Sequence, residues 1–273
     1  MKLSVCVEMI FTEISFIDRI AAVAEAGYEA CEFWGWRQKD LTAIKGAIGR
    51  AGIAVSGLLL DTTATLVDPE THKRLLRDAQ ETFAVAQALH CATVIATTGN
   101  DRSGVSREEQ HAAVVAGLCA LAPHAEDAGI TVVVEPLNTL VDHAGYFLAS
   151  ADEGAEIIRA VDSPAVQLLF DIYHQQVTEG NVSARLDAYR DLIGHIHVAG
   201  VPGRRDPGQG EINYPFLMTQ LRRWPYTKYV GLEYRPLGGS RESVQQTAHL
   251  LRAKPLQGQG VSTTAGCMLE VTR

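Results

Sequence analysis

The stretch AGITVVVEPLN, residues 128–138, contains the unit from which most of the chain is built. Gly129 is typical of a residue that ends a helix, because glycine adopts a left-handed conformation at no steric cost. The β-branched run that follows is typical of a strand buried on both faces of a parallel sheet. The run closes on an acid, Glu135. The stretch therefore predicts a buried parallel strand with a carboxylate at its C-terminal end.

Similar apolar runs recur along the whole chain, separated by segments of helical periodicity. In one such segment Leu75, Ala79, Phe83 and Ala86 recur every three or four residues, which predicts an amphipathic helix. The expected strands are 3–9, 29–34, 53–60, 93–99, 130–136, 166–173, 193–200 and 229–234. The pattern predicts eight strands alternating with about eight helices.

Helix-start signals fall between these runs, as the alternation requires. Asp68 precedes Pro69, which places a capping side chain before a proline in the first helical turn. Ser106 and Ser150 are each followed three residues later by a glutamate, the pattern of a capping box.

The number of repeats decides between two ordinary domains and one large barrel. The 273 residues divide into eight strand–helix units of about 34 residues, and a (β/α)8 barrel needs about 250. No G-x-G-x-x-G follows the first strand, which disfavours an open dinucleotide-binding sheet. We predict an α/β fold with a single (β/α)8 TIM barrel as the catalytic domain over residues 1–256. Residues 257–273 are expected to form a loosely ordered tail.

Composition excludes several classes of protein. Apolar residues make up 47% and charged residues 21%, as in globular proteins, and the net charge is −8. This charge disfavours nucleic acid and anionic membranes as partners. The five cysteines are scattered without a C-x-x-C pair, and the chain has neither an 18-residue apolar run nor a signal-cleavage pattern. We expect a cytoplasmic protein that acts on a small molecule.

Four consecutive strands of the second half end in groups that are costly to bury. They are Glu135, Asp171, His197 and Glu233. Because chemistry in a TIM barrel gathers at the C-terminal ends of the strands, we expect these side chains to converge there. A divalent cation would remove both their desolvation cost and their mutual repulsion. Three oxygens and one nitrogen suit Mn²⁺, Mg²⁺ or Co²⁺ better than structural zinc, although each residue alone could be a helix cap or an ion-pair partner.

Other polar residues near these strand ends receive different interpretations. Glu32 ends the second strand and is expected to face another sector, in an architectural or substrate-rim role. His195 should lie deeper in the barrel, on the same face as His197. His174 is expected to donate a hydrogen bond to substrate, and Arg204 to hold a substrate carboxylate. For Arg204 the alternative is a surface ion pair with Asp206 or Glu211.

Four sequence strings carry a resemblance to a known family. They are EPLN (135–138), FDIYHQQ (170–176), GHIHVAGVPGRRDPGQGEINYPFL (194–217) and GLEYRP (231–236). In these strings the chain resembles the xylose-isomerase-like TIM-barrel superfamily, and within it the hydroxypyruvate isomerase family. Matches of lower density extend from the first strand to about residue 250.

The resemblance implies a site and a reaction. It implies that Glu135, Asp171, His197 and Glu233 ligate one divalent cation, and that Glu135 and Glu233 are the acid–base pair. His174 and Arg204 match positions that contact substrate. The implied reaction converts hydroxypyruvate to tartronate semialdehyde by proton transfer through an enediolate.

The resemblance also leaves alternatives open. Hydroxypyruvate isomerases often have glutamine at the position of His197, whereas the related ketose 3-epimerases have histidine. A ketose 3-epimerase or a 2-oxo-tetronate isomerase is therefore the alternative activity. A non-catalytic barrel subunit would have lost at least one predicted ligand, and an endonuclease for abasic DNA would need a basic face. Relatives often associate through barrel helices, so a homodimer or homotetramer is expected.

Overall fold

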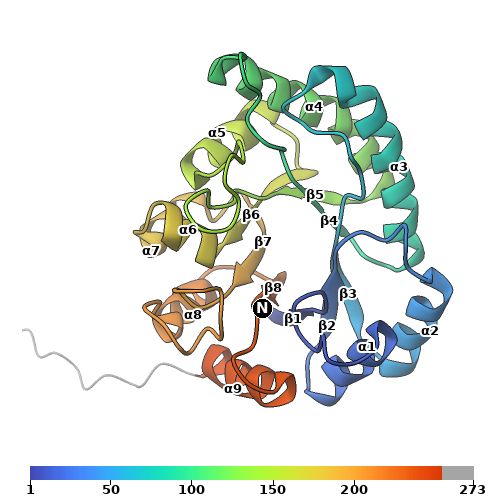
Figure 1. The fold of residues 1–273 in the computed structure, drawn as a ribbon, viewed down its shortest axis with the longest axis vertical. Coiled ribbons are helices and arrows are strands. Elements are labelled where there is room, and N and C mark those ends of the chain that lie inside the picture. The colour runs from blue at the N-terminus through green and yellow to red at the C-terminus, as the bar shows by residue number, and fades with distance from the viewer. Residues whose placement is uncertain (254–273) are drawn as a thin grey trace, which may run out of the picture.

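Eight parallel strands pair in chain order, and the last pairs with the first, so that the sheet closes into a barrel (Figure 1). The computed structural model describes residues 1–253, and the tail predicted at 257–273 lies outside them. The strands are β1 (Lys2–Cys6), β2 (Ala30–Phe33), β3 (Ala54–Leu59), β4 (Thr93–Ala96), β5 (Thr131–Val134), β6 (Val166–Asp171), β7 (Ile193–Val198) and β8 (Tyr229–Leu232). The predicted (β/α)8 barrel is confirmed, and each strand lies within its expected range or begins one residue before it.

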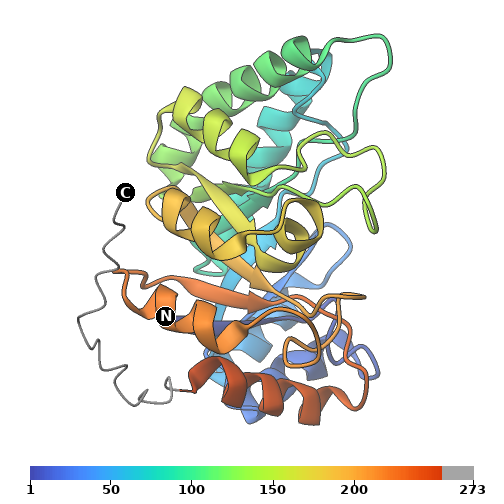
Figure 2. The ribbon, with the colours of Figure 1, turned by 90° about the vertical axis from the view of Figure 1, so that its left-hand side faces the viewer.

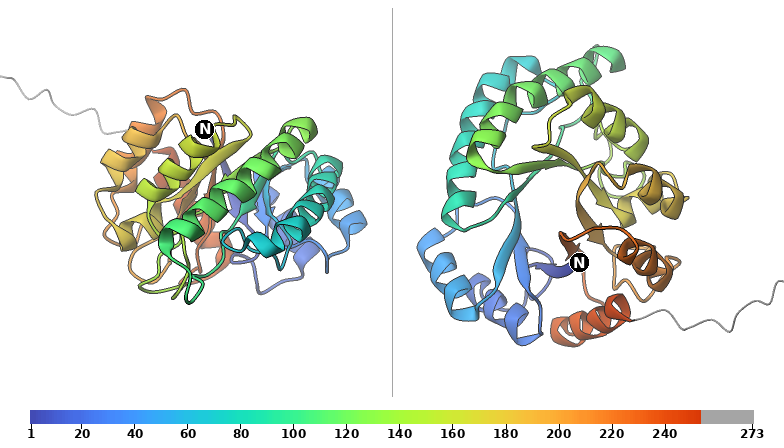
Figure 3. Two further views of the ribbon diagram at one scale, coloured as in Figure 1. Left: turned by 90° about the horizontal axis from the view of Figure 1, so that it is seen from above. Right: turned by 180° about the vertical axis from the view of Figure 1, so that it is seen from behind.

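Helices surround the barrel on its outside, as Figures 1 and 3 show from opposite ends. Within residues 1–253 they are α1 (Phe16–Glu25), α2 (Leu41–Ala51), the 3₁₀ helix η1 (Pro69–Thr71), α3 (His72–Ala88), α4 (Arg107–Ala128), α5 (Ala151–Val161), α6 (Ile172–Thr178), α7 (Val182–Tyr189), α8 (Tyr214–Arg222) and α9 (Ser240–Arg252). None of these helices is long and apolar enough to cross a membrane.

The sixth strand ends earlier than its apolar sequence indicates. The apolar run continues to residue 173, but the strand ends at Asp171, the strand-end residue predicted from the sequence, and Ile172 begins the short helix α6. The reason is Asp171, whose Oδ1 accepts hydrogen bonds from the backbone N–H groups of Tyr173 and His174 and so caps the helix. This helix adds one to the number expected.

The predicted caps form with one difference. Ser106 and Glu109 make the complete capping box of α4, and Gly129 ends that helix with a φ of 66°. Ser150 caps α5 through its hydroxyl, but the carboxylate of Glu153 bonds Arg107 instead of returning to the backbone of Ser150. The second half of this capping box is therefore absent.

Apolar side chains form two separate clusters. The larger one fills the space between the strands and the helices, and the smaller one lies inside the barrel, where Leu59 packs on Ile95, Val133 and Leu169. These four residues come from β3, β4, β5 and β6. The buried polar residues of β1, β2, β3 and β7 include Ser4, Glu32, Ser56, His195 and His197. The barrel interior thus combines an apolar half with a polar half.

The strands all point toward one end of the barrel, where the loops that follow β5 and β7 project (Figure 2). Residues carried by the final turns of the strands therefore meet at this end.

Candidate active site

The four predicted strand-end residues converge at the C-terminal mouth of the barrel. One ligand atom from each of Glu135, Asp171, His197 and Glu233 lies within 4.8 Å of the others. The register explains this, because Asp171 pairs with His197, and His197 pairs with Gly231 on the next strand. Since side chains alternate between the two faces of a strand, the residues two positions earlier lie one layer deeper.

Burial makes this cluster electrostatically demanding. All four residues are at most 6% exposed. Burial alone would raise the pKa of Glu233, but the positive charges of Arg204 and His197 lower it well below its usual range. The pKa of Asp171 is raised by burial, and Arg204 offsets only part of this effect. The cluster therefore needs additional positive charge to hold all its carboxylates ionised.

Several polar atoms of the cluster lack hydrogen-bond partners among the described residues. They are Oε1 of Glu135, Oδ2 of Asp171 and Nδ1 of His197, whereas the unpartnered Nε2 of His197 faces Glu32. Asp171 separates two tasks, since Oδ1 caps α6 and Oδ2 stays free. Buried, unpartnered oxygen and nitrogen atoms that face one another are what a cation site requires. The residues present therefore fit a hard divalent cation such as Mn²⁺ or Mg²⁺.

A cavity of about 340 Å³ opens beside the cluster. Its polar lining consists of Thr97, Glu135, Asp142, His143, Arg204, Glu233 and Arg235, and its apolar lining of Met9, Trp34, Leu59, Ile95 and Leu137. The indole N–H of Trp34 donates to Oε1 of Glu233 at 3.0 Å. The volume lies at the small end of the range for ligand pockets, which suits a small substrate.

Arg204 lies at the edge between the cavity and the carboxylates. Its guanidinium donates to Oε2 of Glu233 at 2.5 Å and lies 3.9 Å from Oδ2 of Asp171. The alternative of a surface ion pair with Asp206 or Glu211 is wrong for Arg204, because its side chain is only 12% exposed and its charge faces the site. Its predicted contact with a substrate carboxylate stays a prediction.

Arg235 is a second cavity residue, and the sequence reasoning missed it. Its backbone N–H donates to the carbonyl oxygen of Arg204 at 2.9 Å, which fixes the two arginines side by side. Within residues 1–253 its guanidinium makes no ion pair, whereas that of Arg204 is bound to Glu233. The available signal was its place in GLEYRP, two residues after Glu233.

His174 is fully buried beside Asp171 and lies outside the set of residues that line the cavity. Its Nδ1 accepts a hydrogen bond from the backbone N–H of Asn138 at 3.1 Å. Burial and the charge of Arg204 lower its pKa to about 3, so that the ring is neutral with its proton on Nε2. That nitrogen lies 3.6 Å from Oδ2 of Asp171. Its expected hydrogen bond to substrate stays a prediction.

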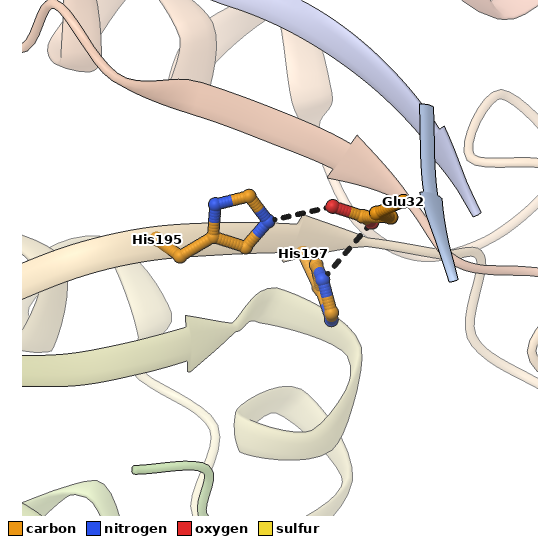
Figure 4. A group of neighbouring side chains, drawn as sticks. All are labelled: Glu32, His195 and His197. Atoms are coloured by element: carbon orange, nitrogen blue, oxygen red, sulfur yellow. Dashed lines mark hydrogen bonds and ion pairs between the residues drawn. The ribbon is translucent and has the colours of Figure 1, made fainter. Parts of the chain in front are cut away.

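Glu32 does not face a different sector of the barrel, and that expectation is wrong. Its carboxylate reaches the barrel interior, where Oε2 bonds Nε2 of His195 at 3.0 Å and Oε1 lies 3.1 Å from Nε2 of His197 (Figure 4). The room comes from Gly231, because a Cβ there would lie 2.2 Å from Oε1 of Glu32. His195 lies deeper than His197, as expected.

A closed (β/α)8 barrel with a carboxylate-lined cavity at its C-terminal mouth belongs to the class of TIM barrels that carry their site on the βα loops. Within this class, the family model described as xylose isomerase-like TIM barrel matches residues 20–254. The chain therefore belongs to this family, which confirms the resemblance seen in the sequence.

The chain is also similar to named proteins over most of its length. A 2-oxo-tetronate isomerase of Cupriavidus necator is 34% identical over 245 residues, covering 85% of this chain and 92% of the relative. A putative hydroxypyruvate isomerase of Streptomyces coelicolor is 30% identical over 254 residues, covering 86% and 91%. A crystal structure described as an AP endonuclease, family 2, from Brucella melitensis superposes with a TM-score of 0.86 at 26% identity, covering 91% and 98%.

Proposed function

We propose that the protein is an isomerase that moves a proton between adjacent carbons of a small α-hydroxy keto acid, converting hydroxypyruvate to tartronate semialdehyde. The observation that carries this proposal is the joint placement of two glutamates and two arginines on one small cavity. The glutamates supply acid–base groups, and the arginines supply positive charge for a carboxylate. The names of the two isomerase relatives support the same class of reaction.

Glu135, Asp171, His197 and Glu233 would hold one divalent cation: Mn²⁺, Mg²⁺ or, as the third choice, Co²⁺. When bound, the cation supplies Lewis-acid stabilisation of the negative charge that develops during enolisation. Three carboxylates face one guanidinium here, so the cluster carries two net negative charges when His197 is neutral. A divalent ion balances that charge.

The proton transfer is assigned to the two cavity glutamates. Glu135 lines the cavity, so its carboxylate can reach the carbon-bound proton of a substrate there. Glu233 is held ionised by Arg204 and oriented by the indole of Trp34. Removal of the carbon-bound proton passes the electron pair of the C–H bond into an enediolate, and a glutamate returns a proton to the neighbouring carbon. The proton of the original hydroxyl group passes to the former carbonyl oxygen, so that the hydroxyl and the carbonyl exchange places.

The two arginines of the cavity are assigned different roles toward an anionic substrate. Because Arg204 is already bound to Glu233, its first task is to hold that carboxylate in place. Arg235 lines the same cavity, and its guanidinium makes no ion pair with residues 1–253, so we assign the substrate carboxylate to it. His174 would offer its Nε2 proton to a substrate oxygen beside Asp171.

A 2-oxo-tetronate isomerase and a ketose 3-epimerase are the second candidates. The first fits the relative at 34% identity and needs only one further carbon in the cavity. The second is favoured by His197, since the resemblance places histidine there in the epimerases. Cleavage of abasic DNA is disfavoured by the net charge of −8, which would repel the phosphate backbone.

Solvent deuterium exchange tests the proposal directly. The protein with Mn²⁺ is incubated in D2O with hydroxypyruvate, 2-oxo-tetronate, fructose or tagatose, and each substrate is analysed by mass spectrometry. We expect deuterium in hydroxypyruvate and its product. Exchange in a ketose alone would assign the epimerase, and exchange in none of the four would contradict the proposal.

Replacement of either glutamate tests the acid–base assignment. We expect Glu135→Gln and Glu233→Gln each to lower exchange by ~100-fold or more, since general acid–base groups contribute about 10²–10⁴-fold. Glu211→Gln, on the loop after β7 and outside the cavity lining, is the control. A glutamine variant that exchanges at the wild-type rate would remove that residue from the role.

A further inference from the structure

Glu32 is buried in the barrel interior, where the proposed reaction gives it no task. Its side chain is 2% exposed and meets three side chains from β3 and β7. Oε2 accepts from Ser56 Oγ at 3.0 Å and bonds His195 Nε2 at 3.0 Å. Oε1 lies 3.1 Å from Nε2 of His197 (Figure 4). Burying an ionised carboxylate costs desolvation free energy unless it is paired and hydrogen-bonded, so these contacts are what make the position of Glu32 tolerable.

His197 spans the distance between Glu32 and the carboxylates at the mouth. Its Nε2 faces Glu32, and its Nδ1 lies 3.2 Å from Oε2 of Glu233 and 3.4 Å from Oε1 of Glu135. Among the described residues, neither Nε2 of His197 nor Oε1 of Glu32 makes a hydrogen bond, and their 3.1 Å separation is an ion-pair contact. Because both atoms are buried, water screens the carboxylate charge of Glu32 only weakly at this ring nitrogen.

The position of one proton decides what His197 can bind. A neutral imidazole carries its proton on one nitrogen, and only the other nitrogen can be a metal ligand. A carboxylate beside Nε2 stabilises the proton there and leaves the lone pair on Nδ1, which faces the cluster. We propose that Glu32 is a positioning residue that fixes His197 in the Nε2-protonated form and so presents Nδ1 to the cation.

The surroundings of Glu32 keep its carboxylate in this orientation. His195 and Ser56 both hold Oε2, which leaves Oε1 for His197. Gly231 on β8 gives Oε1 its space, because a Cβ there would lie 2.2 Å from that oxygen. Gly231 on β8 and His195 on β7 thus both help to orient the Glu32 carboxylate toward His197.

This inference rests on the cation site of the proposed function. Its test therefore measures the affinity for Mn²⁺ and the protonated nitrogen of the His197 ring, and it does not depend on enzyme activity. Calorimetry gives the Kd for Mn²⁺, and ¹⁵N NMR of the Mg²⁺-loaded protein reports which nitrogen of His197 is protonated. We expect Nε2 to be protonated in the wild type. Glu32→Ala should weaken Mn²⁺ binding by roughly 10- to 100-fold, the usual effect of losing such a partner.

Three further variants separate positioning from general damage to the barrel. Glu32→Gln keeps an oxygen that accepts from Nε2–H, so it should recover part of the lost affinity. Gly231→Ala keeps the carboxylate but displaces it, so it should weaken Mn²⁺ binding as Glu32→Ala does. Glu211→Gln lies outside both groups of candidate ligand residues and should leave the Kd unchanged. Thermal unfolding of each metal-free variant identifies any that fail to fold.

The outcomes distinguish this inference from the proposed function. A wild-type protein that binds no Mn²⁺ would overturn the cation site and with it the role of Glu32. Wild-type binding with an unchanged Kd in folded Glu32→Ala would overturn the role of Glu32 alone. A wild-type spectrum with the proton on Nδ1 of His197 would do the same.

Discussion

At the scale of single residues, two neighbouring arginines are expected to perform different tasks. Arg204 is bound to Glu233, whereas the guanidinium of Arg235 lines the cavity and has no ion-pair partner among the residues that the structure describes. We expect Arg235→Gln to raise the KM for hydroxypyruvate by ~10-fold or more with little change in kcat, since hydrogen bonds to charged groups contribute about 1.5–3 kcal/mol. Arg204→Gln should lower kcat, because it releases a glutamate of the acid–base pair.

Steady-state kinetics on hydroxypyruvate and on a neutral ketose check this division. Arg205→Gln is the matched control, since Arg205 follows Arg204 in the chain but lies outside the cavity lining. The division between the arginines is refuted if Arg235→Gln leaves the KM for the acid unchanged while Arg204→Gln raises it.

Sequence reasoning at the residue scale succeeded where the strand pattern determines at which end of the barrel a side chain lies. Glu135, Asp171, His197 and Glu233 end consecutive strands, so the barrel brings them together. It failed for Glu32 of β2, whose reach into the interior depends on the missing side chain of Gly231 on β8, on the far side of β1. It also failed for Arg235, whose free guanidinium is apparent only beside the bound Arg204. Such relations between strands distant in sequence leave no local pattern.

At the scale of elements, the start of α6 joins a structural task to a chemical one. Oδ1 of Asp171 caps the helix, and Oδ2 faces the cluster. Asn caps helices about as well as Asp, whereas replacing a cap by Ala costs typically ~1 kcal/mol. We therefore expect metal-free Asp171→Asn to be more stable than metal-free Asp171→Ala by about that amount, with Mn²⁺ binding weakened in both.

Urea denaturation of the two metal-free variants measures the difference in the free energy of unfolding, and calorimetry measures Mn²⁺ binding. Equal stability of the two variants would show that the cap contributes nothing. Wild-type affinity for Mn²⁺ in either variant would remove Asp171 from the ligand set.

The elements themselves follow from local pattern more closely than the site does. Alternating apolar runs and caps such as Ser106 place the strands and helices, because these signals act within a few residues. The exceptions arise where a polar side chain has competing partners. Asp171 turns the end of an apolar run into a helix cap, and Glu153 prefers Arg107 to the backbone of Ser150.

At the scale of the whole molecule, closure of the barrel brings negatively charged carboxylates together. Their mutual repulsion lowers the stability of the fold, and a bound cation would reduce it. The carboxylates of Glu135, Asp171 and Glu233 lie within one cluster, and Arg204 supplies the nearby guanidinium. Unfolding would separate them and return them to water. The metal-free fold therefore carries electrostatic repulsion, and the proposed cation would remove it only in the folded state.

This coupling predicts that Mn²⁺ stabilises the whole fold. A ligand that binds only the folded state adds about 2.7 kcal/mol at a concentration 100 times its Kd. We expect the Tm to rise with Mn²⁺ concentration and to fall again with EDTA, as measured by differential scanning calorimetry. Asp171→Asn should lose most of this rise, whereas Glu211→Gln, outside the cluster, should keep it. A Tm that does not respond to Mn²⁺, Mg²⁺ or Co²⁺ would mean that the cluster balances its charge without a cation, through Arg204 and protons alone.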